Sequence, residues 1–208
     1  MHVRYSRPVS TPLCVEANTM RSLSRIGANP VSLPLSAEEI LEFHAARLLL
    51  LLSLCGVAGR IDSLTKMAKL DFFARYPDFF EAARAATTSA ATAPTLDQPS
   101  LGEAVESAMV RHHYGPWDKR YYHVLAHLEA KRLITVAKDG NAYRIALSDV
   151  GRKRAKALEA RASFAPLVGR MREIKKTFGS RSGASLKALI YRLFDSEVGR
   201  RPMGHLIR

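Results

Sequence analysis

A β-hairpin pattern followed directly by a helix is the feature that most restricts how this chain can fold. Residues 133–154 read LITVAKDGNAYRIALSDVGRKR. Apolar residues alternate with other positions on both sides of an Asp139–Gly140 pair, namely Ile134, Val136, Tyr143, Ile145 and Leu147. An Asp-Gly pair suits the positive φ angles of a tight hairpin turn. Ser148 or Asp149 can cap a helix directly afterwards, so the segment predicts strand, turn, strand and helix.

Residues that cap and break helices predict further helices before the hairpin. A capping box of Ser36 and Glu39 predicts the first helix, over about 37–54. The segment DSLTKMAKLDFFARYP predicts a second, amphipathic helix that its first Asp or Ser caps and its Pro ends. A short third helix follows over PDFFEAARAA, and a fourth, over about 117–132, begins after a Gly-Pro break.

These patterns divide the chain into five parts. We expect a basic arm at 1–35, the first helices of a core at 36–86, a linker rich in Thr, Ala, Ser and Pro at 87–103, a helix–hairpin–helix part at 104–160, and C-terminal helices at 161–208. The expected fold class is mainly α with a small β-hairpin, a winged-helix-like domain followed by C-terminal helices. The long insertion between residues 77 and 116 departs from a minimal winged helix.

The charge of the chain is strongly positive and unevenly distributed. The formal net charge is +13, and residues 101–208 alone hold 22 Lys and Arg against 10 Asp and Glu. A clustered positive field concentrates ligands that carry phosphate, although it does not determine the fold. We therefore expect a polyanionic partner, with nucleic acid favoured over an acidic protein surface and over charge that serves only solubility.

The helix over 117–132 and the residues after it supply the candidate nucleic-acid contacts. On a helical wheel, Tyr121, Val124, Leu125 and Leu128 share one side, and Lys119, Arg120, His123, His127 and Lys131 lie on the other. The hairpin adds Lys138 and Arg144, and the following helix adds Arg152, Lys153, Arg154 and Lys156. Residues that read base edges are scarce, so we expect contacts mainly to the backbone of double-stranded DNA. The alternative is that these cations are simply exposed to water.

The sequence contains little that indicates catalysis. His123 and His127 have the i, i+4 spacing of two metal ligands, and His112 and His113 could join them, but no Glu follows the first His as in HExxH. The segment FGSRSGAS could hold a phosphate, although a linker between helices is favoured. We interpret Asp71, Asp78 and Glu81 as solvated helix charges. We therefore expect a protein that is not an enzyme, with no catalytic residue, metal or cofactor.

The apolar segments and the cysteines favour a cytoplasmic protein. The apolar run at 48–52 is much shorter than the ~20 residues that a membrane span needs, so it predicts a buried helix and no membrane association. Cys14 and Cys55 lie in unlike contexts and indicate neither a disulfide framework nor a thiolate metal site.

Three segments together suggest a family: GRIDSLTKMAKLDFFARYP, YGPWDKRYYHVLAHLEAKRLI and FGSRSGASLKALIYRLFDSEV. Over roughly residues 37–200 the chain resembles the small middle component of bacterial three-component ABC systems of the Lamassu type. This resemblance implies a winged-helix-like accessory subunit that accompanies an SMC-like ATPase and an effector protein in antiviral defence. It further implies binding to the ATPase, with DNA met at the assembled complex, and it carries over no catalytic residue.

The leading hypothesis is thus a non-enzymatic accessory subunit of a DNA-sensing ATPase complex. The alternative is a stand-alone winged-helix transcriptional regulator, dimeric through its terminal helices. A nuclease is a third hypothesis, for which the sequence shows no metal cluster. Four phenylalanines, at positions 72, 73, 79 and 80, could either dock a partner or fill the protein's own core.

Overall fold

The computed structural model describes residues 40–88, 109–113, 115–140, 142–200 and 202–207. The chain divides into two units, Met1–Leu35 and Ser36–Arg208, and every described residue belongs to the second. The predicted arm at 1–35, the capping box of Ser36 and Glu39, and most of the predicted linker at 87–103 lie outside the described residues.

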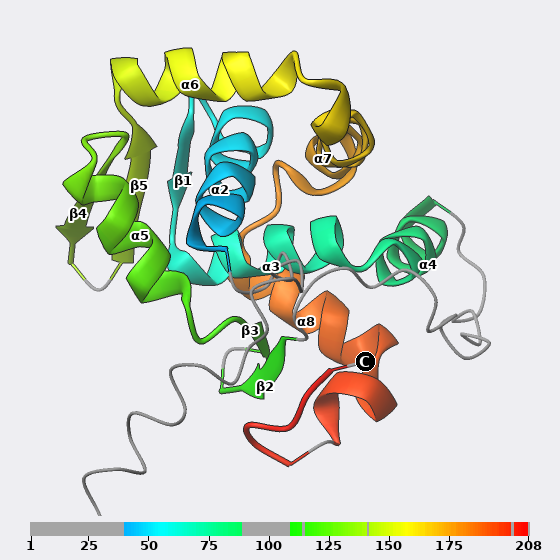
Figure 1. The fold of residues 1–208 in the computed structure, drawn as a ribbon. Helices are drawn as coiled ribbons and strands as arrows, with labels where there is room; N and C mark the ends of the chain where they lie inside the picture. Colours follow the sequence, from blue (N-terminus) through cyan, green and yellow to red (C-terminus); the bar gives the residue numbers. More distant parts are fainter. Residues whose placement is uncertain (1–39, 89–108, 114, 141, 201, 208) are drawn as a thin grey trace, which may run out of the picture. The chain divides into compact units, whose positions relative to one another are not determined.

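The described part is mostly helical and includes a small antiparallel sheet, as the coarse fold class predicts (Figure 1). Its helices are α2 (Leu41–Cys55), α3 (Leu64–Arg75), α4 (Pro77–Thr88), α5 (Tyr121–Ala130), α6 (Asp149–Glu159), α7 (Ala165–Phe178) and α8 (Gly183–Leu193). Short 3-10 and π-helical segments cover Ala162–Phe164 and Asp195–Gly199. The strands are β1 (Arg60–Asp62), β2 (Val110–His112), β3 (Gly115–Trp117), β4 (Ile134–Asp139) and β5 (Ala142–Leu147).

Side-chain caps fix the starts of two helices where the sequence predicts them. The Ser63 hydroxyl accepts the Lys66 N–H at the start of α3, at 3.4 Å. The Ser148 hydroxyl accepts the Gly151 N–H at the start of α6, at 3.0 Å. Pro77 does more than end α3, because it is also the first residue of α4, where its missing N–H costs no helical hydrogen bond.

The predicted hairpin forms, but its turn lies one residue later than expected. Asp139 pairs with Ala142 as the last pair of the β4–β5 ladder, so the turn begins at Gly140, which has a φ of 58°. Glycine takes this left-handed conformation without the Cβ clash that other residues meet. Tyr143 is also 38 % exposed, whereas the alternation predicts it on the buried face.

A third strand, which we did not predict, completes the sheet in the order β1–β5–β4. Ile61 of β1 pairs with Ile145 of β5, and both side chains are buried. β1 has only three residues, too few to show a strand periodicity, and it forms because β5 offers a free edge for hydrogen bonding.

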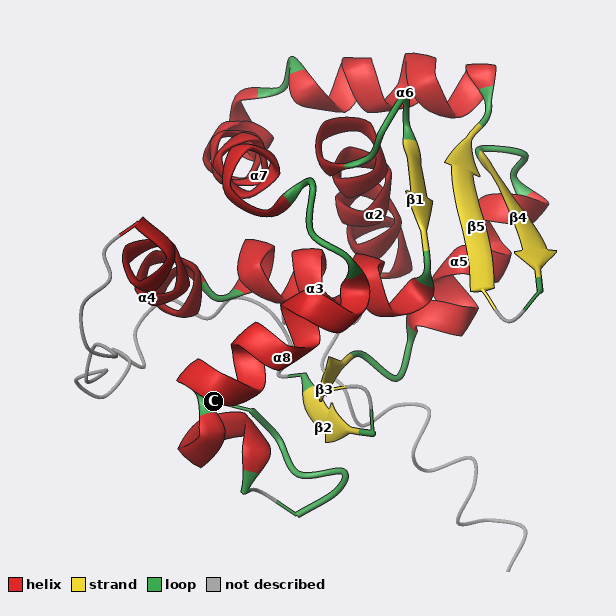
Figure 2. Cartoon of the chain, turned by 180° about the vertical axis from the view of Figure 1, so that it is seen from behind, coloured by secondary structure: helices red, strands yellow, loops and turns green. Residues whose placement is uncertain are grey.

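The core is built around α2 and α3, as Figure 2 shows from behind. The apolar run Leu48–Leu52 is buried in α2, in agreement with its interpretation as a core helix. Phe72, Phe73, Phe79 and Phe80 are all at most 2 % exposed. Ring centroids lie 4.8 Å apart for both Phe73–Phe178 and Phe79–Phe194. These four phenylalanines therefore fill the protein's own core, and the idea that they dock a partner is wrong.

A second hairpin, β2–β3, occupies residues that we expected to be a break and the first turn of a helix. Its strands pair Val110 with Trp117, so α5 begins only at Tyr121 rather than near residue 117. The hairpin is anchored by Lys69, which is fully buried in α3 and donates from Nζ to the Pro116 carbonyl oxygen at 2.8 Å.

Lys69 should make stability depend on pH. Burial, followed by the positive charge of Lys187, lowers the pKa of Lys69 to about 7. Between pH 7 and 10 the unfolded chain therefore binds a proton that the folded chain does not, so the free energy of unfolding should rise with pH, by up to about 1.4 kcal/mol per pH unit. Urea unfolding at about pH 7 and pH 9.5 should show this rise, and Lys69→Met should lose it. Equal pH dependence in both proteins would contradict a buried lysine with a lowered pKa.

Candidate nucleic-acid interface

A buried polar network fixes the start of α5 against α3. The Tyr121 hydroxyl donates to Asp71 Oδ2 at 2.8 Å. Just before α5, Asp118 accepts the Arg120 N–H at 2.9 Å and a hydrogen bond from Arg75 at 2.9 Å. Both anchors join α5 to residues of α3 that are far away in the sequence, so they set the position of the whole helix.

The same network corrects our interpretation of Asp71 as a solvated charge. Asp71 is fully buried, and Arg47 of α2 donates to it from Nε at 2.9 Å. The Arg47 guanidinium also contacts His44 Nδ1 at 2.9 Å. A buried carboxylate needs such partners, because an isolated charge in a protein interior is strongly unfavourable.

The electrostatics of the network follow from burial and from its charges. Burial, together with the negative charge of Asp71, raises the pKa of Tyr121 well above its ordinary value, so its hydroxyl remains a hydrogen-bond donor. Burial alone would raise the pKa of Asp118, but hydrogen bonds from Arg120 and the charge of Arg75 hold that pKa well below its usual range. At neutral pH, Asp118 is therefore a carboxylate and Tyr121 keeps its proton.

The exposed and buried sides of α5 are those that the helical wheel predicts. Tyr121, Val124, Leu125 and Leu128 are all at most 5 % exposed, which confirms the predicted apolar face. On the other side, Lys119, His123 and Lys131 are exposed, and Arg120 and His127 are partly buried. Arg120 is held by Asp118, with its Nε 3.1 Å from Oδ1. The exposed side of α5 therefore presents most, but not all, of the predicted cations.

The cations of the hairpin are partly neutralised by acids. Lys138 is exposed near the tip. Arg144 lies 2.6 Å from Asp139 and 3.5 Å from Asp62, and Arg60 lies 3.2 Å from that same Asp62. The exposed side of the sheet is thus closer to charge balance than the sequence suggests, because β1 brings an acid that the hairpin alone lacks.

The predicted cations of α6 lie at the other end of the hairpin. Arg152 contacts Asp149 at 2.9 Å and the Leu147 carbonyl at 3.0 Å, whereas Lys153, Arg154 and Lys156 are exposed. α6 begins just after the Ile134–Leu147 pair at the base of the hairpin, five residue steps from the last pair before the tip. At about 3.3 Å per residue, base and tip are roughly 17 Å apart.

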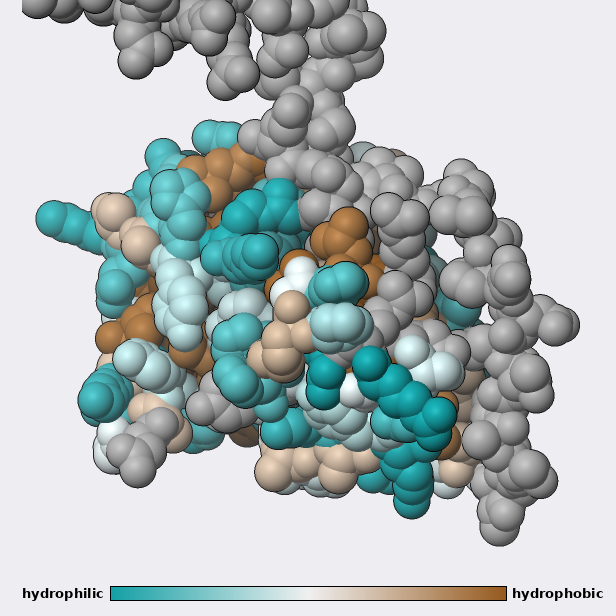
Figure 3. Space-filling view, turned by 90° about the horizontal axis from the view of Figure 1, so that it is seen from below, coloured by the Kyte–Doolittle hydropathy of each residue, from teal (hydrophilic) through white to brown (hydrophobic). Residues whose placement is uncertain are grey.

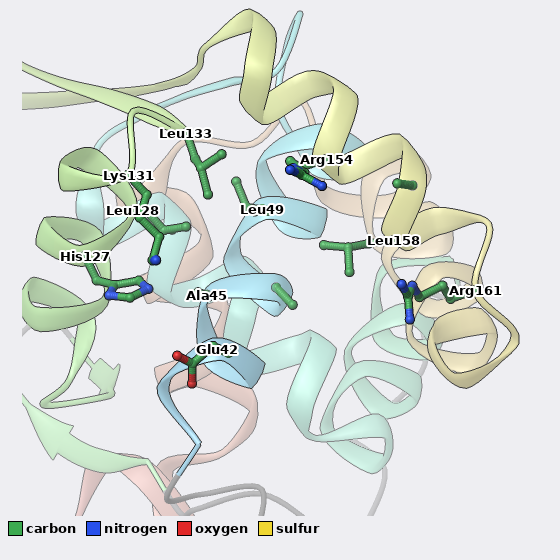
Figure 4. Close-up of a pocket in the computed structure, with 12 residues that line it drawn as sticks. Glu42, Ala45, Leu49, His127, Leu128, Lys131, Leu133, Arg154, Leu158 and Arg161 are labelled. Atoms are coloured by element: carbon green, nitrogen blue, oxygen red, sulfur yellow. The ribbon is translucent and has the colours of Figure 1, made fainter.

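The predicted residues therefore fall into two groups, and three residues belong to neither. The α5–hairpin face comprises Lys119, Arg120, His123 and Lys138, and the α6 cluster comprises Arg152, Lys153, Arg154 and Lys156. Arg144 pairs with Ala137, next to the Lys138–Tyr143 pair, so its side chain lies on the opposite side of the hairpin from that of Lys138. Figures 1 and 2 show α6 at the opposite end of the sheet from the β4–β5 turn, and β4 running back beside α5. His127 of α5 and Lys131, the residue that caps the end of α5, lie on the side that faces α6 (Figure 4).

A hollow lies between α5 and α6, and α2 forms its floor. It has a volume of about 260 Å³ and brings together His127, Lys131 and Arg154 from the predicted set (Figure 4). It also includes Arg161 and Glu42, which we did not predict as site residues. Arg161 follows the end of α6 and has an extended backbone, so helical periodicity could not have placed it in the hollow.

Tyr122 is a third exposed residue that the sequence analysis missed. Its side chain is 61 % exposed on α5, and its ring centroid lies 6.0 Å from that of Trp117. On the helical wheel it falls outside both the apolar and the cationic sector. Its exposure could therefore not be inferred from the periodicity.

Figure 3 shows the hydropathy of the described surface as it is seen from below. Most of the described surface visible there is hydrophilic, and hydrophobic residues form small, separate areas. Nucleic-acid interfaces are polar and rich in positive charge, so a surface of this kind is compatible with one.

The structure also bears on two further possibilities that the sequence raised, a metal site and a phosphate-binding segment. Within the described residues, no group of three or more His, Cys, Asp and Glu is placed to hold a metal. The FGSRSGAS segment joins α7 to α8 and is attached to α3, because Lys66 donates from Nζ to the Gly179 carbonyl at 2.9 Å. A side chain at Gly183 would also overlap the Lys66 backbone. In this structure the segment is a packed connection between helices.

Comparison with protein-family models, with curated proteins and with solved structures found no match to this chain. None of the helices in the described part combines the length and the apolar character needed to cross a membrane.

Proposed function

We propose that the described fold is a winged-helix domain that binds the backbone of double-stranded DNA through the α5–hairpin face. The order helix, strand, helix, helix and hairpin supports this proposal, with α4 and the β2–β3 hairpin as insertions. The main supporting observation is the division of α5, whose apolar side is fully buried while its cationic side is exposed beside a projecting hairpin. A helix that enters a groove needs this division.

We further propose that the chain is a non-enzymatic, cytoplasmic accessory subunit of an SMC-like ATPase complex with an effector protein in bacterial antiviral defence. This part depends on the three segments that resemble Lamassu-type systems. Co-expression with the neighbouring genes, followed by purification, should recover the chain together with the ATPase. Failure to associate, combined with tight binding to one short palindrome, would instead favour a stand-alone transcriptional regulator.

The DNA-binding part is tested by charge reversal on the α5–hairpin face. Lys119→Glu combined with Lys138→Glu should weaken binding to a duplex of arbitrary sequence by at least about tenfold, because two phosphate contacts become repulsive. Arg152→Glu, Lys153→Glu and Arg154→Glu together should weaken binding less. The hairpin base is roughly 17 Å from the tip, which is about twice the Debye length at physiological salt. Fluorescence polarisation with a labelled duplex measures both effects.

The control for this test is a charge-matched variant on other helices. Arg84→Glu combined with Lys176→Glu changes the net charge equally but lies on α4 and α7. Both side chains are at least half exposed, so the fold should tolerate the changes. If the control weakens binding as much as the Lys119 and Lys138 pair, attraction by the overall charge explains the binding and the proposed face is incorrect.

A further inference from the structure

The hollow between α2, α5 and α6 has the shape of a short trough. Its floor on α2 consists of Glu42, Ala45, Ala46 and Leu49, and its wall consists of Arg154, Ala157 and Leu158 of α6 and of Arg161, which lies just after the end of that helix. The α2 residues have the spacing i, i+3, i+4 and i+7, and the three α6 residues have the spacing i, i+3 and i+4, so each set forms one stripe along its helix. Seven residues of helix span about 10 Å, or two turns. The trough therefore runs along two helices for about the length that two turns of a third helix would cover.

The trough is apolar inside and positively charged at its edges. Small side chains, such as Ala45 and Ala157, leave the space open, and Leu49 and Leu158 line it. Lys131 stands on the α5 side, and Arg154 and Arg161 stand on the α6 side (Figure 4). None of these three forms an ion pair with another residue of the described part. Among the described residues that line the trough, only Glu42 is acidic, so the edges favour an acidic occupant.

The size of the trough argues against a small-molecule cofactor. Its volume of about 260 Å³ is below the range of about 300–1,000 Å³ that is usual for ligand pockets. A hollow of this size instead suits one or two apolar side chains of a larger partner. An amphipathic helix supplies such side chains at i and i+3 or i+4, and its flanking positions can carry acids.

We propose that this trough docks an acidic amphipathic helix of a partner protein. The apolar stripe of that helix enters between α5 and α6, and its carboxylates meet Lys131, Arg154 and Arg161. The inference depends on the proposed accessory function only because that function supplies a partner. The trough and the α5–hairpin face share no residue, so partner docking and DNA binding are separable.

The test uses a designed peptide as the probe. A fluorescein-labelled helix of about 18 residues carries leucines at i, i+3, i+4 and i+7 with glutamates on both flanks, long enough to form a helix. A second peptide has the same composition with the leucines scrambled. Fluorescence polarisation should show at least tenfold weaker binding of the scrambled peptide. Equal binding of the two peptides would mean attraction by charge alone and would overturn the proposal.

Two variants and one control test whether the peptide binds in the trough. Arg161→Glu reverses one edge charge, and Ala157→Phe fills the hollow without changing the charge; each should weaken peptide binding at least tenfold. Lys153→Glu is the control, because Lys153 is exposed on α6 but does not line the trough. Its effect should stay within about twofold, since an exposed charge is screened by solvent. Equal affinity of parent, Arg161→Glu and Ala157→Phe would refute docking at this position.

Duplex binding and self-association are measured on the same proteins. Arg161→Glu and Ala157→Phe should keep duplex binding, whereas Lys119→Glu with Lys138→Glu should lose it and keep peptide binding. Peptide binding by a parent that binds no duplex would contradict only the proposed DNA function. If sedimentation shows a dimer that Ala157→Phe dissociates, the occupant is a second copy of this chain and the proposal of an acidic partner helix fails.

Discussion

Replacement of Asp71 by alanine is expected to destabilise the protein by about 3–5 kcal/mol, the usual cost of breaking a buried ion pair. Asp71 is fully buried, and it accepts hydrogen bonds from Arg47 and Tyr121. Its removal takes the nearest carboxylate away from the buried Arg47 guanidinium, and it removes one of the two anchors between the start of α5 and α3. Urea unfolding followed by circular dichroism measures the loss.

Two comparison variants separate the charge from the hydrogen bond. Tyr121→Phe removes only the hydroxyl that donates to Asp71, so it should cost about 1.5–3 kcal/mol. Asp78→Ala changes an exposed acid near the start of α4 and should stay within about 0.5 kcal/mol of the parent. If Asp71→Ala were no more destabilising than Asp78→Ala, the buried network would not hold α5 in place.

Binding to duplex DNA is expected to fall about a thousandfold when salt is raised from about 50 to 200 mM. The expectation assumes that roughly six phosphates are neutralised, each of which releases counterions. Arg120, Arg144 and Arg152 are each held by a neighbouring acid, so this number requires contacts from the exposed cations of α6 as well as from the α5–hairpin face. Fluorescence polarisation over a salt series gives the slope of log affinity against log salt.

The salt series, repeated with unrelated duplexes, tests DNA binding itself and its dependence on sequence. A flat dependence would contradict DNA binding by either an accessory subunit or a transcriptional regulator. Equal affinity for unrelated duplexes is the expected result for backbone contacts, because these carry no sequence information. Strong preference for one sequence would mean that side chains such as the exposed Tyr122 read the DNA in a way that we do not propose.

The candidate interface was only partly accessible to sequence analysis. The helical wheel identified the buried face of α5 because neighbours on one helix face are three or four residues apart. It could not show that Asp118 holds Arg120 or that Asp62 of β1 approaches Arg144, because those contacts depend on how separate segments pack. The sequence therefore supplied the candidate cations, but their distribution over the surface came from the tertiary structure.

The sequence by itself determined that helices form after residue 40, that the β4–β5 hairpin exists, and that the apolar run of α2 and the apolar face of α5 are buried. Caps such as Ser63 and Ser148, and the periodicity of apolar residues, are local signals that act within one or two turns. Only the tertiary structure decided the β1–β5 pairing, the burial of Asp71 and the trough between α2, α5 and α6. Asp71 meets Tyr121 across fifty positions of the chain, and such a contact leaves no periodic trace. Local patterns report neighbours along the chain, whereas burial and charge pairing depend on which distant segments fold together.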